Sequence, residues 1–221
     1  MVTRVETVRT QAFQLWLKPT LAELGWNQPG PVSTAYVEPI DTWAEMNQTR
    51  DAENWPADDA PGLIAYFCGP MKDSRSEPAP FTHPEFPEQQ RALVYRTMKD
   101  FLTRHIGHLW PAGTRAGHPN ALKWELLMAP KNCRGENRLK TQFWTANIDP
   151  SDRYVLALPG TTQYRLRSDE SGFDNLYLAG DWTRNALNAG CVEAAVTSGM
   201  RVAQTISGHP KQIIGETDFP R

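Results

Sequence analysis

The chain has 221 residues, 40% of them hydrophobic, and a formal net charge of -2 at pH 7. This length and composition suffice for one large domain or two small ones with an apolar core. Charges of both signs are mixed along the chain, which argues against binding nucleic acid or an anionic membrane through charge. The three cysteines are odd in number and far apart, so they fit neither a disulfide framework nor a paired-cysteine zinc site.

The same features bear on cellular location. Met1 to Glu6 carries charges where a secretory signal would place its apolar stretch, and no apolar run approaches membrane-spanning length. The widely spaced cysteines fit a reducing compartment. We therefore expect a cytoplasmic protein without a transmembrane segment, with peripheral association with a membrane as the alternative.

The first third of the chain predicts helices and strands. Apolar residues recur at helical spacing from Val5 to Trp16, and Pro19 should end that helix. Thr20 to Glu23 has the form of a capping box that opens a short second helix. Val32 to Val37 and Leu63 to Cys68 are short runs rich in β-branched and aromatic residues, and each predicts a strand.

The middle of the chain predicts loops around one amphipathic helix. Asn54 to Pro56 and Met71 to Pro87 are typical of surface loops. After Pro87, residues at steps of three and four predict a helix with one buried face: Val94, Met98, Phe101, Leu102, His105, Ile106 and Leu109. Residues 110–120 are typical of a turn-rich loop, and residues 122–128 fit either a strand or a helix.

His105 and His108 are the candidate metal ligands of this helix. They lie three residues apart, but only His105 faces the apolar side and the sequence offers no third ligand. We therefore predict packed or solvated histidines and no metal site. The sequence has no repeat or low-complexity tract. The best domain boundary is Asp149 to Asp152, which divides the chain into residues 1–150, 151–210 and a tail, 211–221.

The segment after Phe173 carries the chemistry. Leu176 to Ala179 is a continuous apolar run, which predicts a strand buried on both faces of a parallel sheet. Gly180 and Asp181 follow it directly. A glycine at this position lets a ligand approach the backbone, and an aspartate at the carboxyl end of a parallel strand can accept hydrogen bonds from ligand hydroxyls.

A second helix is predicted from Gly190, with a glycine C-cap and a proline stop at Ser207 to Pro210. Its predicted inner face is made of mostly small residues: Val192, Ala195, Val196, Gly199, Val202, Ala203 and Ile206. The backbone amides from Gly190 to Glu193 lie at the positive end of the helix dipole. This end favours an anionic or electron-rich ligand group.

These segments, Asn175 to Thr183, Gly190 to Val196 and Ser198-Gly199, resemble the C-terminal flavin motif of the amine oxidase and phytoene desaturase superfamily. Gln11 to Leu17 and Ser151 to Val155 are similar to upstream stretches of desaturase-like members. The resemblance implies an FAD-dependent oxidoreductase. It also implies an α/β (α+β) fold, in which residues 1–150 form a mixed substrate domain and residues 151–210 form the C-terminal part of a Rossmann-like FAD-binding domain.

The resemblance also implies roles for individual residues. Asp181 would contact the ribityl or pyrophosphate part of FAD, and the backbone around Cys191 would lie near N1 and the C2 carbonyl of the isoalloxazine. The expected cofactor-binding residues are Gly180, Asp181, Trp182, Gly190, Cys191, Val192 and Glu193. Because the flavin supplies the electron transfer, hydride chemistry needs no protein base, and no catalytic residue is assigned.

The chain departs from the family at the dinucleotide-binding βαβ unit. No two glycines are separated by a single residue, so the Gly-x-Gly-x-x-Gly turn that cradles the pyrophosphate is missing. The chain is then a subunit of a split enzyme, a truncated product or a domain repurposed without flavin. We expect an N-terminal FAD-binding chain or an oligomer partner.

A second departure concerns the substrate. Amine oxidases of the family place an aromatic residue just after the glycine that opens the last helix, whereas this chain has Cys191. This favours a desaturase, dehydrogenase or isomerase acting on an apolar small molecule, isoprenoid or carotenoid-like. Cys191 fits either a redox thiol or, more simply, a packing residue. Trp144, Tyr164 and Trp182 fit either the substrate side of the flavin or the core. The alternative function is a non-catalytic module that binds a lipid or a partner.

Overall fold

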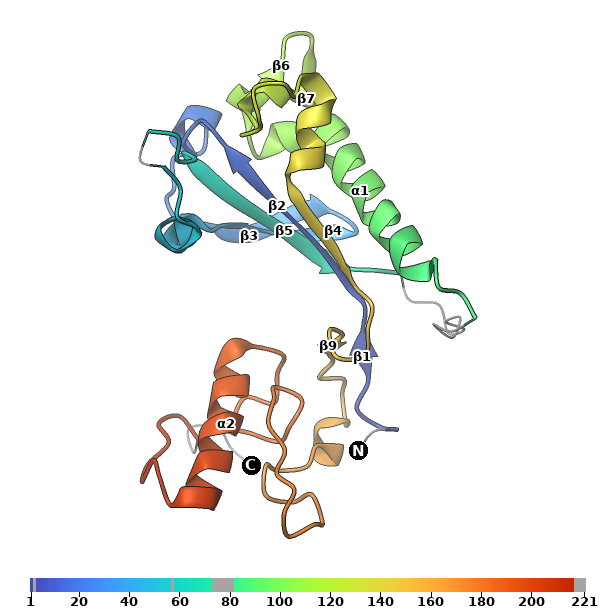
Figure 1. Cartoon of the computed structure of the whole chain (residues 1–221), viewed down its shortest axis with the longest axis vertical. Helices are drawn as coiled ribbons and strands as arrows, with labels where there is room; N and C mark the ends of the chain where they lie inside the picture. Colours follow the sequence, from blue (N-terminus) through green and yellow to red (C-terminus); the bar gives the residue numbers. More distant parts are fainter. Residues whose placement is uncertain (2, 57, 73–81, 217–221) are drawn as a thin grey trace. The chain divides into compact units, whose positions relative to one another are not determined.

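The structure of the chain is a computed structural model that describes residues 1, 3–56, 58–72 and 82–216 (Figure 1). Internal contacts divide the chain into two units. Arg9–Asp149 form the first, which we call the sheet unit. Met1–Val8 and Pro150–Arg221 form the second, which we call the C-terminal unit. Among the described residues, no helix is long and apolar enough to span a membrane.

The sheet unit is built on a five-stranded sheet in the order β3-β4-β5-β2-β8, with all neighbours antiparallel. The strands are β2 (Thr10–Leu17), β3 (Val32–Val37), β4 (Ile40–Glu45), β5 (Leu63–Pro70) and β8 (Phe143–Asn147). Helix α1 (Phe86–Arg104) packs on the sheet, and β6 (Thr114–Arg115) pairs with β7 (His118–Leu122). The described parts of the chain are therefore a mixed α+β fold, as predicted.

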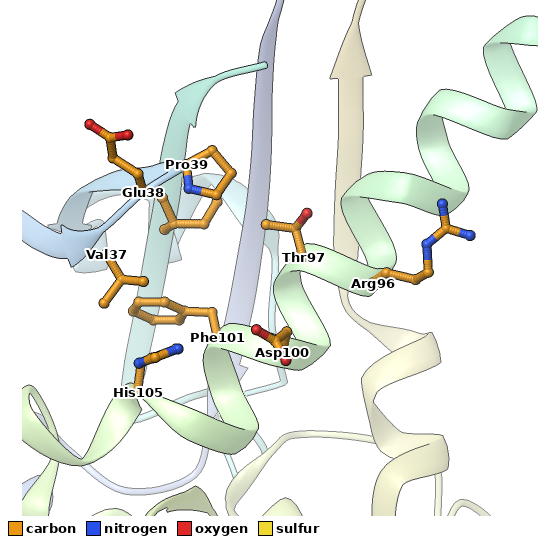
Figure 2. Close-up of a pocket in the computed structure, with 9 residues that line it drawn as sticks. Val37, Glu38, Pro39, Arg96, Thr97, Asp100, Phe101 and His105 are labelled. Atoms are coloured by element: carbon orange, nitrogen blue, oxygen red, sulfur yellow. The ribbon is translucent and has the colours of Figure 1, made fainter. Parts of the chain in front are cut away.

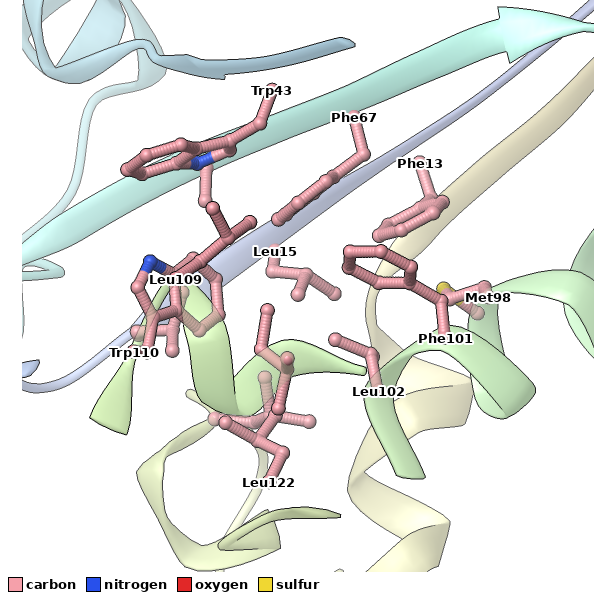
Figure 3. Close-up of a cluster of buried hydrophobic side chains, with 14 of the residues drawn as sticks. Phe13, Leu15, Trp43, Phe67, Met98, Phe101, Leu102, Leu109, Trp110 and Leu122 are labelled. Carbon is pink, nitrogen blue, oxygen red and sulfur yellow. The ribbon is translucent and has the colours of Figure 1, made fainter. Parts of the chain in front are cut away.

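The hydrophobic core lies between the sheet and α1 (Figure 3). The register places Phe13 beside Phe67 and Leu15 beside Ala65, and because side chains alternate along a strand, these four point to the same face of the sheet. Phe13 and Phe67 stack with ring centroids 4.8 Å apart. The buried residues of α1 are Val94, Met98, Phe101 and Leu102, at the predicted helical spacing. Aromatic rings from three strands and one helix thus fill a single core.

The helix predicted from Val5 to Trp16 is wrong, because this segment forms strands β1 (Thr7–Val8) and β2. Strand β2 hydrogen-bonds to β5 on one side and to β8 on the other, and apolar residues on both of its faces are buried. A central strand of this kind loses the alternation of apolar and polar residues that marks a half-buried strand. Its apolar residues can then match a helical period by chance.

The other predictions for this unit have mixed outcomes. The two strands predicted at residues 32–37 and 63–68 are confirmed. The capping box forms, with the Thr20 amide donating to Glu23 Oε2 at 2.8 Å, but it opens only the 3₁₀ turn Ala22–Leu24. The predicted loop at residues 110–120 is wrong, since it contains β6 and the start of β7. The undecided segment holds the 3₁₀ turn Trp124–Leu126. Much of the predicted loop 71–87 lies outside the described residues.

A carboxylate on the other face of the sheet fixes the 3₁₀ segment Asn47–Glu53. Glu53 Oε2 accepts hydrogen bonds from the indole N–H groups of Trp16, at 2.6 Å, and Trp55, at 2.7 Å. Its other oxygen accepts from Gln14 Nε2 at 3.1 Å. Hydrogen bonds to an ionised acceptor are stronger than neutral ones. The cluster therefore anchors this segment to β2.

The C-terminal unit contains little regular structure. Strand β1 pairs with β9 (Tyr154–Val155), and α2 (Val192–Ser207) is its long helix. Of the buried apolar residues that the structure describes, this unit holds only Val155, Ala194 and Ile213. Many of its large apolar side chains are exposed instead: Tyr154, Tyr164, Phe173, Leu176, Trp182, Leu187, Val192, Val196, Met200, Ile206 and Ile214. By itself the unit has almost no apolar core.

The core of the sheet unit can be tested by a substitution at Phe67, because the ring of Phe67 contacts four other aromatic rings. Phe67→Ala should lower the free energy of unfolding by about 3–5 kcal/mol, the cost of deleting a buried aromatic side chain. Urea denaturation of the full chain measures it. Val32→Ala on β3, where Val32 is 76% exposed, is the control and should cost less than about 0.5 kcal/mol. Equal losses would contradict the assigned core.

Candidate functional site

The apolar run Leu176 to Ala179 leads into the candidate site, but it is not a strand. The prediction of a strand buried on both faces is wrong, since Leu176 is 47% exposed and no described strand pairs with this segment. A parallel strand becomes buried only between neighbouring strands with layers on both faces. None of the described residues supplies these neighbours. Leu176 and Ala179 are exposed, and Tyr177 and Leu178 are only half-buried.

The Gly180-Asp181 turn is held by hydrogen bonds from three sides. The Gly180 amide donates to Ser198 Oγ of α2 at 2.8 Å, and Thr183 Oγ1 donates to the Gly180 carbonyl at 2.8 Å. Arg165 Nη1 donates to the Asp181 carbonyl at 2.8 Å. Gly180 has φ 133°, and a Cβ there would lie 2.3 Å from Trp182 Nε1. Glycine suits this positive φ, and the three hydrogen bonds hold the backbone of the turn without a ligand.

Asp181 is left with an available carboxylate. The side chain is half-buried, and within the described ranges no donor of the chain forms a hydrogen bond or ion pair with it. Because the backbone of the turn is fixed, the carboxylate is held in place without being occupied. It can accept hydrogen bonds from the hydroxyl groups of a ligand.

Arg165 is the site residue that sequence reasoning missed. Its side chain is only 2% exposed. It donates to the carbonyls of Asp181 and, at 3.2 Å, Leu156, while its Nε has no partner. Burial lowers the pKa of Arg165, and the nearby charge of Asp181 opposes that shift. A fixed positive charge therefore lies behind the turn. Arginines are mostly exposed, so a single sequence gives no signal that this one is buried.

The second half of the candidate site is the start of α2. Cys191 is the N-cap residue in an extended conformation, and its side chain makes no capping hydrogen bond. Among the described residues, no acceptor forms a hydrogen bond with the backbone amides of Val192 and Glu193. These amides and the helix dipole leave a positive end open to an anionic or electron-rich group.

Gly190 is required by a neighbouring ring. The Tyr154 hydroxyl donates to the Gly190 carbonyl, and a Cβ on Gly190 would lie 2.6 Å from the Tyr154 ring. Strand β9 therefore places an aromatic ring against the N-terminus of α2. Tyr154 is the second residue of this site that the sequence did not single out.

The predicted helix is confirmed, but its inner face is wrong. The side that packs on the unit carries Ala194 and Ser198, whose Oγ accepts from Gly180. The apolar face points outward, with Val192 75% exposed. We call this face the α2 stripe: Val192, Val196, Met200, Ala203 and Ile206. Helical spacing finds an apolar face, but what covers that face depends on the rest of the fold.

The structure separates the other aromatic candidates. Trp144 belongs to the sheet unit, where it packs against Tyr95 at 5.1 Å. Tyr164 and Trp182 are part of the C-terminal unit, and both are exposed. His105 and His108 join no group of three or more metal-ligating side chains in the described ranges.

Two ionisable groups lie on the face of the sheet opposite α1. Burial raises the pKa of Tyr66 to about 12 and also raises the pKa of Cys68. Both groups therefore stay protonated at neutral pH. Neither can serve as a base or as a thiolate nucleophile there.

A pocket of the sheet unit lies between the β3–β4 turn and α1 (Figure 2). Its walls are Val37, Glu38, Pro39, Ile40, Arg96, Thr97, Asp100, Phe101 and His105. Asp100 is already paired with Arg104 at 2.9 Å. None of the predicted cofactor-binding residues lines this pocket.

Comparison with known families identifies one match. Residues 132–207 match the model of the family described as flavin containing amine oxidoreductase. All seven predicted cofactor-binding residues fall within this range, although their individual roles stay predictions. No curated protein and no solved structure matches the chain.

The packing of Gly190 against Tyr154 can be tested by a double-mutant cycle. Gly190→Ala should destabilise the chain by roughly 1–3 kcal/mol, the cost of overpacking. The loss should shrink when Tyr154→Ala removes the ring. Gly199→Ala on the same helix is the control: its Cβ meets nothing within 4 Å, so it should stabilise by about 0.5–1 kcal/mol. Equal losses for Gly190→Ala in both backgrounds, measured by urea denaturation, would contradict the contact.

Proposed function

We propose that the chain forms part of an FAD-dependent oxidoreductase of the flavin amine oxidase superfamily and supplies one wall of the flavin site, a proposal that the match over residues 132–207 supports. The observation that carries this proposal is the available carboxylate of Asp181. A fixed turn presents it, and the open N-terminus of α2 belongs to the same unit. An acceptor for hydroxyls and a positive helix end fit the ribityl chain and the electron-rich edge of a flavin.

Different residues of the chain would contact different parts of FAD. Asp181 would accept from ribityl hydroxyls or bind near the pyrophosphate, with Gly180 and Trp182 beside it. The backbone of Gly190, Cys191, Val192 and Glu193 would contact the isoalloxazine edge. When bound, FAD supplies a two-electron acceptor for hydride removal from the substrate. The amides at the start of α2 would favour negative charge on that edge, because their dipoles are fixed in advance.

We propose further that a polypeptide segment outside these 221 residues, such as an N-terminal FAD-binding chain, supplies the phosphate cradle. The sequence has no Gly-x-Gly turn to provide one. The uncovered state of the C-terminal unit supports this proposal, because monomeric proteins rarely leave contiguous apolar patches exposed. The α2 stripe and the segment from Leu176 are the surfaces that such a segment would cover.

The proposed substrate is an apolar small molecule, isoprenoid or carotenoid-like, and the proposed reaction is a desaturation, dehydrogenation or isomerisation. Cys191 replaces the aromatic residue that amine recognition would use. On the face of the sheet opposite α1, Trp16, Tyr66 and Phe143 provide aromatic surface that suits apolar ligands, and the Glu53 carboxylate on that face is already bound by Trp16, Trp55 and Gln14. Because Tyr66 and Cys68 stay protonated, neither of them can act as a base on this face, in keeping with a reaction whose electrons leave through the flavin.

A second candidate is a non-catalytic module that binds a lipid or a partner protein without flavin. This candidate is supported by the missing phosphate cradle and by the exposed α2 stripe, which would then serve only as a binding surface. The colour of the purified chain separates the candidates. The enzyme proposal requires a yellow complex once a Gly-x-Gly-x-x-Gly segment is added, whereas a colourless complex would favour the module.

By itself the chain should bind FAD weakly, because it lacks the cradle that provides much of the affinity. It should also bind a hydrophobic dye through the α2 stripe. Val196→Lys should reduce dye fluorescence and weaken association with the nucleotide-binding segment, whereas Val32→Lys on β3 should change neither. Isolation of the chain alone with stoichiometric FAD would contradict the split site. Equal dye binding in both variants would contradict the stripe.

Asp181→Ala should weaken FAD binding in the completed complex by about 1–3 kcal/mol, the range for a lost hydrogen bond to a charged group. Its backbone contacts with Arg165 persist, so the melting temperature of the variant should be close to that of the parent chain. Flavin fluorescence titration measures the affinity. Asp174→Ala, exposed and outside the turn, is the matched control. If both variants lose the same affinity, Asp181 is not a flavin ligand.

A further inference from the structure

A second pocket of the sheet unit contains Arg50, which forms no ion pair with a carboxylate of the described residues. The pocket has a volume of about 310 Å³ and is formed by the turn after Ala22–Leu24, the end of β4 and the start of Asn47–Glu53. Leu21, Trp26 and Pro29 form its apolar walls, and Glu45, Asn47 and Arg50 form its polar ones. This volume lies at the lower end of the range for small-molecule sites, roughly 300–1,000 Å³.

Arg50 is only partly satisfied. Its one hydrogen bond within the described chain runs from Nη2 to the Gly62 carbonyl at 3.2 Å. Its Nε is buried and has no acceptor. No carboxylate of the described residues lies within 4.0 Å of the guanidinium. A partly buried guanidinium that leaves most of its five donors unused is unfavourable unless a further acceptor is supplied.

The other groups of the pocket add donors and no free acid. Trp26 Nε1 is buried and has no acceptor. The side-chain amides of Asn27 and Gln28, which line the rim, make no hydrogen bond to the described residues. Glu45 is the acidic residue of the wall, and its two oxygens already accept from the Gly30 amide and from Asn47. The pocket therefore offers donors in excess of acceptors.

We propose that this pocket binds a small monocarboxylate with an apolar, preferably aromatic, body. The carboxylate pairs with Arg50, whose planar guanidinium matches two oxygens at once. The body lies against Trp26 and Leu21. The charge of Glu45 in the same wall disfavours a dianion such as phosphate, so a single carboxylate is the better fit. This site lies within the sheet unit and does not depend on the flavin proposal.

Benzoate is the probe, titrated into the full chain and followed by calorimetry, with benzamide as its uncharged analogue. Benzoate should bind with a dissociation constant in the millimolar range, and benzamide at least about tenfold more weakly, the effect of roughly 1.4 kcal/mol. Arg50→Gln should weaken the binding of benzoate by a similar factor. Arg134→Gln, an exposed arginine outside the pocket, should not. Inorganic phosphate should bind more weakly than benzoate.

If Arg50→Gln fails to fold, the comparison of benzoate with benzamide still tests the proposal, because both ligands are titrated into the chain without substitutions. Trp26→Leu provides a second variant, which should weaken benzoate while sparing any binding of acetate. Equal affinity for benzoate and benzamide, or unchanged benzoate affinity in a folded Arg50→Gln, would overturn the proposal. So would phosphate binding more tightly than benzoate, or no benzoate binding at all.

Discussion

Burial of apolar side chains between the sheet and α1 holds the sheet unit together, and the C-terminal unit has almost none of it. Around Phe67, rings from β2, β4 and α1 meet in one core. In the C-terminal unit the apolar residues of α2 point outward. Since apolar burial is the dominant favourable term in folding, the described residues of the C-terminal unit contribute little of that term.

Where a core is missing, polar contacts fix the candidate site. Ser198, Thr183 and Arg165 hold the backbone of the Gly180-Asp181 turn from three directions. All three engage main-chain atoms, so the Asp181 carboxylate remains available. A site whose backbone is fixed loses little conformational freedom when a ligand arrives, which favours binding. The buried charge of Arg165 is the cost of this arrangement, and an electron-rich ligand would offset it.

Sequence patterns predicted the features that depend on local chemistry. The buried face of α1 up to Leu102, the strands β3 and β5, and the end of α2 at Gly208 follow from periodicity and caps, whereas α1 ends at Arg104 and the predicted helical positions His105, Ile106 and Leu109 lie beyond it. The failures depend on neighbours distant in sequence. Strand β2 resembled a helix because it is covered on both faces, and the Leu176 segment needs partner strands that the described chain lacks. The resemblance to the flavin motif singled out Asp181 and the start of α2 as candidate cofactor-binding residues, and these roles stay predictions. Nothing local distinguished the buried Arg165 from an exposed arginine.

The pairing of β1 with β9 also determines the order in which the chain can fold. Thr7 pairs with Val155, so the C-terminal unit is discontinuous and the whole sheet unit is inserted between its two parts. During synthesis the sheet unit can fold as soon as Asp149 has emerged, because domains generally fold as units. The first residues must wait until Tyr154 and its strand appear. A chain shortened at its N-terminus would therefore lose support for a ring beside Gly190, more than a hundred residues away.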